Sequence, residues 1–410
     1  MQLNISGTQL RGFIKPLACP VKTLEGVDID KIRFAITEEE VDRKMLTAVV
    51  TQPNYTVTLH LNLSGDPALR DPDVPAEEKA ALQEAVDANA ECGEAGMHWL
   101  MRHSDLKNII DSIGEKKCDF IFDVGFLKVM QTDEKAEPLG CYRVEAFKRS
   151  GALSVADVGM LGKAVRQATG VLQMGQFADL LTEAINVCSF AGKKGPLCKQ
   201  AIHLHFEGQQ VRVEALTDTL AVTKTASINA PIDAAAPKKL HLSICVAAAQ
   251  ALKSAVECGG SDVYWCYDST EGRLVVTCQP YTLSIAVEKV NQCELPKVRP
   301  GKFIVGLWRA DVIATLRFAI ASGHDRVLVF VEESKCVRMC TKDLRVDRLI
   351  VTQPILAVAL EDRHFVLPTK PLLQAFRNFE GEVVELAFDD DNPYVHFSDS
   401  AKLEAFVWMK

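Results

Sequence analysis

Apolar residues recur every three or four positions in six segments of the chain, the spacing that places them on one face of a helix. These segments are 8–18, 104–113, 176–190, 243–258, 309–322 and 369–379. Alternating or β-branched runs, typical of strands, lie between them and include 55–63, 120–130, 201–206, 211–216, 273–278, 282–287, 327–331, 383–388 and 403–409. The pattern predicts a strand-rich α+β chain with six well-spaced helices.

The predicted elements repeat in one order: a strand, a helix and then several strands. The helix starts at 176 and 243 lie 67 residues apart, those at 309 and 369 lie 60 apart, and those at 8 and 104 lie 96 apart because of an acidic stretch at 64–96. A long internal period of this kind indicates repeated units, here three similar domains of two strand–helix–strand modules each. The predicted domains are 1–148, which contains the insertion 64–96, then 149–299, and finally 300–410.

Two segments fit this repeat less well. Residues 149–169 form either a linker ahead of the second domain or a short helix, since they are longer than a usual connection. Residues 72–91, rich in Ala, Glu and Asp, fit an inserted helix and a loop equally well. Both alternatives stay open at the level of sequence.

Charge is distributed unevenly along the chain. The sequence has 46 Lys and Arg against 54 Asp and Glu, a net charge of −8. Residues 64–96 hold nine acidic and two basic side chains and so contribute −7, which leaves the rest nearly neutral. An acidic balance disfavours a simple nucleic-acid binder, which usually has a basic excess. It leaves room for local basic faces.

Composition favours a globular cytoplasmic protein without membrane contact. Of the 410 residues, 48% are hydrophobic and 24% charged, which excludes a disordered chain. No apolar run reaches the roughly 18 residues of a membrane span, and the N-terminus lacks a secretion signal. Thirteen scattered cysteines without a C-x-x-C pair indicate reduced, mostly buried thiols.

Candidate chemical sites are few, and each has an ordinary alternative. The spacing of a phosphate-binding loop is missing from the sequence, and Gly-Lys-Lys-Gly at 192–195 is either a phosphate contact or a solvated turn. His203 and His205 share one strand face but have no third metal ligand at a telling distance, and Cys336 and Cys340 are spaced too loosely for zinc. The acidic run 389–391 fits a turn better than a cation site. We expect no metal, no cofactor and no enzymatic activity.

Basic side chains recur on the outer faces of the predicted helices. Arg11 and Lys15 are spaced i, i+4 on the first helix, and the sixth has Lys370, Gln374 and Arg377 at i, i+4 and i+7. A single basic face is usually only solvated, but recurrence favours sequence-independent, salt-sensitive contact with phosphates. The phosphate-contact candidates from these faces are Arg11, Lys15, Lys107, Lys253, Arg317, Lys370 and Arg377. The third helix departs from the pattern, since it has Asp179 and Glu183.

The segment 177–222 has a distinctive order: a helix, a Ser-Phe-Ala turn, a strand ending in Phe-Glu, and a strand leading into Thr-Asp and Leu-Ala-Val. It resembles the second domain of the bacterial DNA polymerase III beta subunit, the sliding clamp. Residues from 302 onward resemble the third domain, with 405–410 as its apolar closing strand, and 1–63 with 96–147 resemble the first.

The resemblance implies three similar α+β domains per chain and a head-to-tail homodimeric ring around double-stranded DNA. It implies a non-enzymatic processivity factor without cofactor, which tethers a replicative DNA polymerase and is placed on DNA by a separate clamp loader. The acidic insertion 64–96 would then lie outside the DNA-filled hole, because like charges repel.

Site residues also follow from the resemblance. The family binds partner peptides in a groove between the second and third domains, and the matching positions are Ala201, Thr217, Leu220, Pro296, Val407 and Met409. Simple core packing is the alternative for each of them. Ile320 matches one side of the ring interface, and Tyr142 and Val144 match the other. The family's DNA-contact regions add Lys22, Lys193, Lys194 and Lys199.

One departure from the family concerns the groove. Where the family has Asp-Gly-His-Arg-Leu after a Thr, this chain has Thr217-Asp218-Thr219-Leu220, which is two residues shorter. The rim of the groove is therefore expected to differ, and so is the bound peptide. Two other hypotheses stay open: a clamp-shaped scaffold that binds proteins without encircling DNA, and an enzyme whose site the sequence does not reveal.

Overall fold

A computed structural model describes the chain in segments. The described residues are 2–6, 31–40, 43–52, 54–62, 98–113, 117–123, 126–132, 138–145, 166–190, 200–208, 210–227, 239–259, 262–288, 303–332, 336–356, 363–388, 393–399 and 403–409. The described part forms two compact units. Unit 1 comprises Met1–Gly175, Ile232–Ala236 and Gln250–Val287, and unit 2 comprises Gln176–Pro231, Pro237–Ala249 and Glu288–Lys410.

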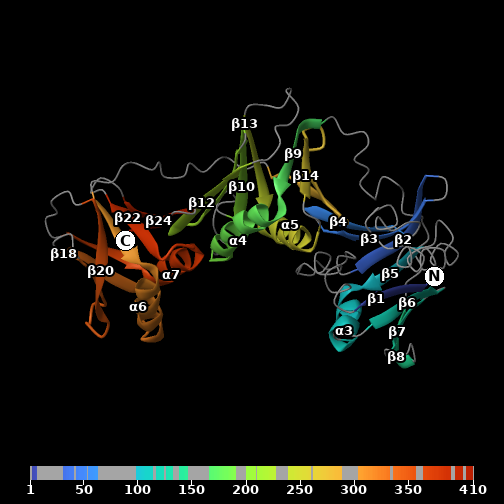
Figure 1. Cartoon of the computed structure of the whole chain (residues 1–410), viewed down its shortest axis with the longest axis horizontal. Helices are drawn as coiled ribbons and strands as arrows, with labels where there is room; N and C mark the ends of the chain where they lie inside the picture. The colour runs from blue at the N-terminus through green and yellow to red at the C-terminus, as the bar shows by residue number, and fades with distance from the viewer. Residues whose placement is uncertain are drawn as a thin grey trace, which may run out of the picture. The chain divides into compact units, whose positions relative to one another are not determined.

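Helices in the described residues are α3 (His103–Ile113), α4 (Met174–Phe190), α5 (Val246–Cys258), α6 (Arg309–Ala321) and α7 (Thr369–Asn378) (Figure 1). Five of the six predicted helices are thus confirmed, and the sixth, at 8–18, lies outside the described residues. The helix predicted to start at 243 begins at Val246 instead. Ser243 and Cys245 extend the preceding strand, where they pair with His203 and Ala201.

Unit 1 contains two antiparallel sheets. Their strands are β1 (Gln2–Ser6), β2 (Lys31–Glu40), β3 (Arg43–Thr51), β4 (Tyr55–Asn62), β5 (His98–Arg102), β6 (Lys117–Asp123), β7 (Phe126–Thr132), β8 (Pro138–Glu145), β9 (Arg166–Gln173), β14 (Asp262–Asp268), β15 (Arg273–Cys278) and β16 (Tyr281–Ala286). The strand orders are β1-β6-β7-β8 and β5-β2-β3-β4-β16-β15-β14-β9. The single strand predicted over 120–130 is wrong: the chain reverses there, and Phe122 pairs with Leu127.

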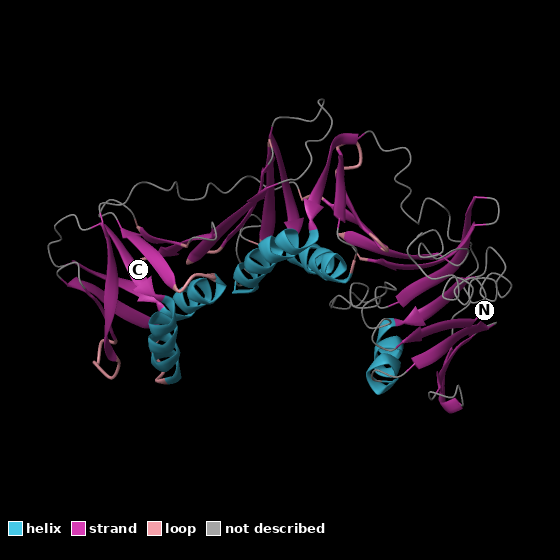
Figure 2. Cartoon of the chain, in the orientation of Figure 1, coloured by secondary structure: helices cyan, strands magenta, loops and turns pink. Residues whose placement is uncertain are grey.

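The described residues of unit 2 form one 12-stranded sheet. Figure 2 draws the strands of the chain in magenta and the helices in cyan. The strands of this sheet are β10 (Ala201–Glu207), β11 (Gln210–Leu216), β12 (Leu220–Ser227), β13 (Lys239–Cys245), β17 (Phe303–Trp308), β18 (Arg326–Glu332), β19 (Cys336–Cys340), β20 (Asp347–Leu356), β21 (Arg363–Pro368), β22 (Val383–Phe388), β23 (Tyr394–Ser398) and β24 (Leu403–Trp408). Their order is β13-β10-β11-β12-β24-β23-β22-β17-β20-β19-β18-β21.

In each unit, one pair of described strands joins segments of neighbouring predicted domains. In unit 1, β16 pairs with β4, with Tyr281 opposite Leu59. In unit 2, β12 pairs with the C-terminal β24, from Leu220 opposite Val407 to Lys224 opposite Leu403. Both joins give a partner to strands whose backbone groups would otherwise be open to pairing with other chains. The joins link segments of neighbouring predicted domains, and the three-domain division stays a prediction.

Aromatic side chains form the centre of the third predicted domain. Phe376 on α7 is fully buried, and its ring centroid lies 5.7 Å from that of Phe379 and 5.2 Å from that of Phe397, both in edge-to-face geometry. Such rings bury about 150–250 Å² each, so α7 is held mainly by hydrophobic contact. α7 and α6 pack against each other beside the strands (Figure 1). This packing determines which side chains face outward.

Candidate functional site

A tight hairpin connects β11 and β12 at the predicted groove. The Thr217 amide donates to the Leu220 carbonyl over 2.7 Å. The Thr217 hydroxyl donates to the same carbonyl over 2.9 Å and accepts the amides of Leu220, at 2.9 Å, and Thr219, at 3.3 Å. A threonine hydroxyl that bonds the backbone of its own turn stabilises a short loop. Thr217 therefore holds the shortened loop in place.

The end of the chain is tied to this hairpin. The Trp408 amide donates to the Thr219 carbonyl over 3.2 Å, and the Met409 amide donates to the Pro393 carbonyl over 2.8 Å. Because Leu220 is paired with Val407 as well, the structure brings Thr217, Leu220, Val407 and Met409 together at the β12–β24 join.

Burial divides the predicted groove residues. Ala201, Leu220 and Val407 are 0%, 1% and 0% exposed, so the chain's own side chains cover them. Ala201 is also two strands away from β12. Met409 is half-buried and Thr217 is nearly covered. Pro296 lies outside the described residues.

An aromatic cluster at the same join is not among the residues predicted from the sequence. Phe406 packs with Leu216 and Ala221, and half-buried Tyr394 and Trp408 lie against them. The Tyr394 ring centroid is 5.5 Å from that of Phe406 and 6.0 Å from that of Trp408. The alternation of Phe406 and Trp408, and of Tyr394 and His396, on neighbouring strands was the available signal.

The basic candidates on α6 and α7 face outward. Arg317, Lys370 and Arg377 are exposed, and within the described residues none of the three forms an ion pair. Gln374, expected on the same face, is buried instead, and its side-chain amide donates to Asn378 over 3.1 Å. The basic face of α7 therefore consists of Lys370 and Arg377 alone.

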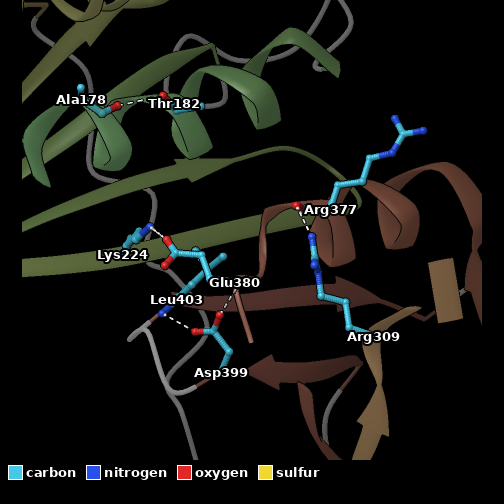
Figure 3. Close-up of polar contacts among 8 residues, drawn as sticks. All are labelled: Ala178, Thr182, Lys224, Arg309, Arg377, Glu380, Asp399 and Leu403. Atoms are coloured by element: carbon cyan, nitrogen blue, oxygen red, sulfur yellow. Dashed lines mark hydrogen bonds and ion pairs between the residues drawn. The ribbon is translucent and has the colours of Figure 1, made fainter. Parts of the chain in front are cut away.

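Arg309 at the start of α6 has a structural role. Its Nε donates to the Phe376 carbonyl over 2.9 Å and its Nη2 to the Arg377 carbonyl over 3.2 Å, while the Arg377 side chain points away (Figure 3). A cation on the last carbonyls of a helix satisfies unpaired acceptors and opposes the helix dipole. Arg309 thus ties α7 to α6.

Lys253 is the candidate on α5 and is partly engaged. It is half-buried, and its Nζ lies 2.7 Å from Glu257 Oε1, one helical turn away. Lys107 is placed on α3, as predicted, by its backbone position. The candidates Arg11, Lys15, Lys22, Lys193, Lys194 and Lys199 lie outside the described residues.

The predicted interface residues lie at ends and edges. Ile320 is half-buried near the end of α6, where Phe318 is 59% exposed. Leu344, in a left-handed conformation with φ of 55°, is 61% exposed. Tyr142 and Val144 lie on β8, which is an edge strand of its four-stranded sheet.

The histidines singled out in the sequence belong to a polar cluster. His203 Nδ1 lies 2.9 Å from Ser243 Oγ, and His205 Nε2 lies 2.9 Å from Glu214 Oε2. The His241 ring stacks on His205 with centroids 4.4 Å apart. Burial, together with the neighbouring histidines, lowers the pKa of His241 to about 4.

The cluster does not have the arrangement of a metal centre. In the part of the chain that the structure describes, no group of three or more His, Cys, Asp or Glu side chains is placed to hold a metal ion. Cys188 and Cys278 are buried thiols, and burial raises the pKa of each to about 12, which makes them poor nucleophiles. None of the described helices is long and apolar enough to cross a membrane.

Comparison with known proteins identifies the fold. No protein-family model and no curated protein matches the sequence. Among solved structures, the chain is similar to the DNA polymerase sliding clamp of Bacillus subtilis, with a TM-score of 0.73, 8% identity, and coverage of 100% of this chain and 99% of the other. The DNA polymerase III beta subunit of Thermotoga maritima gives a TM-score of 0.72, 11% identity and coverages of 100% and 99%.

A further match is the Helicobacter pylori beta clamp, solved with a DNA ligase peptide, with a TM-score of 0.68, 10% identity and full coverage of both chains. At identities this low the likeness shows the fold alone. The chain has the α+β fold of the sliding clamps along its whole length, which confirms the fold that the sequence resemblance implied.

Proposed function

We propose that this chain is a DNA sliding clamp: a non-enzymatic processivity factor that encircles duplex DNA as a homodimeric ring and tethers a replicative DNA polymerase. The observation that carries the proposal is the full-length match to sliding clamps, which covers 100% of this chain and 99–100% of theirs. A partial match would leave room for a different assembly. The proposal includes neither a metal nor a nucleotide cofactor, and it assigns loading to a separate clamp loader.

The DNA contacts in this proposal come from the outward faces of α6 and α7. Arg317, Lys370 and Arg377 are exposed and have no carboxylate partner among the described residues. Long cationic side chains that meet phosphates without reading bases give weak contact that does not depend on DNA sequence. A ring needs no stronger contact, because closure retains the DNA.

The ring interface in this proposal pairs the end of the third predicted domain with the edge of the first. Exposed Phe318 and Leu344 and half-buried Ile320 support an apolar contact on one side. On the other side, β8 offers an edge strand that includes Tyr142 and Val144. Pairing between copies would bury that edge.

Partner binding in this proposal uses the β12–β24 join. The hairpin held by Thr217, together with half-buried Met409, Tyr394 and Trp408, supports a rim that an aliphatic or aromatic peptide side chain could contact. Buried Leu220 and Val407 would support this rim from below. Polymerases and a clamp loader are the expected sources of the peptide.

The solution mass tests the ring. Light scattering at low micromolar concentration should give twice the 45.1 kDa chain mass. Phe318→Glu should shift the mass toward one chain, because a charge at an apolar contact must lose its hydration. Tyr264→Glu is the matched control, since Tyr264 is 52% exposed and lies outside the proposed interface. A monomeric wild-type chain contradicts the autonomous ring.

A clamp-shaped scaffold that does not encircle DNA is the second candidate. It is favoured by the charge of α4, which has Asp179 and Glu183 and no basic residue, and by the pairing of Lys253 with Glu257. A scaffold would bind polymerase peptides in full while all DNA retention is lost. Peptide binding and DNA retention measured on one preparation separate the two.

A further inference from the structure

A single buried cation lies at one end of the β12–β24 join. Lys224 is the last β12 residue paired with β24, opposite Leu403, and it is 8% exposed. Its Nζ donates to Glu380 Oε1 over 2.9 Å, and Glu380 is 63% exposed on its side chain (Figure 3). A buried ammonium is costly unless it is paired. The Lys224–Glu380 contact is thus the ion pair between β12 and the residues that follow α7.

A hydrogen-bonded chain closes around this pair. The Glu380 amide donates to Asp399 Oδ2 over 3.0 Å, and the Leu403 amide donates to Asp399 Oδ1 over 3.2 Å (Figure 3). Leu403 in turn is the residue opposite Lys224. We call Lys224, Glu380, Asp399 and Leu403 the junction clasp, because together they connect the end of the β12–β24 ladder to the residue after α7.

A second carboxylate, Glu183 on α4, is buried and interacts electrostatically with members of the clasp. One side-chain oxygen of Glu183, Oε2, is buried and has no hydrogen-bond partner. The charged groups around it are Lys224 on β12, Glu380 after α7, Asp399 after β23, and Asp179 one turn earlier on α4. Three carboxylates and one ammonium therefore act electrostatically on Glu183. Burial is the first cause that raises the pKa of Glu183, to about 7; the three carboxylates add to the shift and Lys224 opposes it.

We propose that Glu183 is a second acceptor for Lys224, and that ionisation of Glu183 draws Lys224 away from Glu380 and loosens the junction clasp. With Glu183 neutral, Glu380 is the acceptor in ion-pair contact and the clasp is closed. With Glu183 ionised, two carboxylates compete for one ammonium, and the less exposed one interacts more strongly because solvent screens it less. The end of the β12–β24 ladder then frays more often. The device is independent of whether the chain encircles DNA.

The first test is a carboxyl-carbon NMR titration of the full chain labelled at glutamate, with the Glu183 signal identified by its loss in Glu183→Gln. The wild-type midpoint should be near 7. In Glu380→Gln the midpoint should fall, since a like charge is removed and Lys224 loses its other partner. Glu382→Gln is the control: this neighbouring exposed carboxylate is not among the charges acting on Glu183, so the midpoint should not move. An ordinary glutamate midpoint near 4.5, or no response to Glu380→Gln, overturns the proposal.

The second test measures fraying directly. Amide exchange at Leu403, corrected for the intrinsic effect of pH, should become about threefold faster from pH 6 to pH 8 in the wild type, the size expected for a partly exposed ion pair. Glu183→Gln cannot ionise and should show no such change. An equal change in both proteins, or none in the wild type, contradicts the clasp.

Discussion

Helices α4 and α7 each belong to one strand–helix–strand module, yet their charged side chains have opposite sign. α7 has Lys370 and Arg377 and no acidic residue, whereas α4 has Asp179 and Glu183 and no basic one. The Glu183 carboxylate of α4 interacts electrostatically with Lys224 at the β12–β24 join, where a basic residue would repel it. The repeated modules thus share a backbone arrangement, while the charge of each helix matches the groups near it. Exposed basic side chains support the proposed DNA contact for α6 and α7 and not for α4.

The comparison requires that α7 be firmly anchored, so that its basic face has a defined direction. Phe376→Ala should lower the free energy of unfolding of unit 2 by about 3–5 kcal/mol, because it leaves a cavity among Phe379 and Phe397. Urea unfolding monitored by circular dichroism measures the loss. A loss below 1 kcal/mol would mean that α7 is held by other contacts.

The comparison also predicts a pH effect at α4. Because the folded-state pKa of Glu183 is raised to about 7, its contribution to stability is complete below pH 4.5 and is lost as pH rises to 7. Glu183→Gln avoids that loss, so its free energy of unfolding at pH 8 should exceed that of the wild type by about 2 kcal/mol. This figure is reduced because Glu183 is incompletely buried.

Two histidines change stability in the opposite direction over part of this pH range. Burial lowers the pKa of His241 and His396 to about 4, so their contribution is present above pH 6.5 and is lost as pH falls toward 4. In the Glu183→Gln variant stability should still fall from pH 6.5 to 4.5, although Glu288 and Glu404, whose pKa values burial raises, oppose part of the fall. His241→Asn and His396→Asn added to that variant should remove the fall, and an unchanged fall would contradict both assignments.

Removing the basic face should weaken DNA binding without unfolding the chain. Arg317→Ala, Lys370→Ala and Arg377→Ala combined should reduce the salt dependence of binding by roughly 2–3 units of the log–log slope, and affinity by about tenfold at low salt. Fluorescence anisotropy over a salt series measures both. The control removes Arg212 and Lys239, two cations outside the proposed DNA face and ring interface that pair with Glu214 and Glu207. An equal effect in both variants would show that only net charge matters.

A smaller effect separates the two arginines of α6. Arg309→Ala should cost about 1–2 kcal/mol of stability, since the Phe376 and Arg377 carbonyls lose their donor. Arg317→Ala should change stability by less than about 0.5 kcal/mol, because its side chain is exposed. Thermal unfolding of the two variants measures both losses of stability. Equal losses would contradict these roles.

Sequence periodicity predicted most of the described fold because long helical stripes and alternating runs depend on local spacing. It placed α4, α6 and α7 within two residues at each end. It failed at Ser243–Cys245, where pairing with β10 outweighs helix propensity, and at the hairpin between β6 and β7. Both errors come from contacts that spacing along the chain does not encode.

The sequence predicted less of the candidate site than of the fold. Exposed Lys370 and Arg377 follow from helical spacing, but the burial of Gln374 depends on Asn378 and the surrounding core. Three of the groove positions, Ala201, Leu220 and Val407, are covered, and the aromatic pair Tyr394 and Trp408 was missed. The apolar character of a residue does not distinguish a side chain that lines a pocket from one that is packed in the core.

Retention on circular DNA tests the proposed function most directly. The chain is assembled on nicked circular duplex DNA, separated from unbound protein at high salt, and then treated with a restriction enzyme that linearises the DNA. A clamp that encircles DNA stays bound to the circle and is released when an end is made, because closure rather than contact holds it. Equal retention on circular and linear DNA, or no retention on either, would contradict the account.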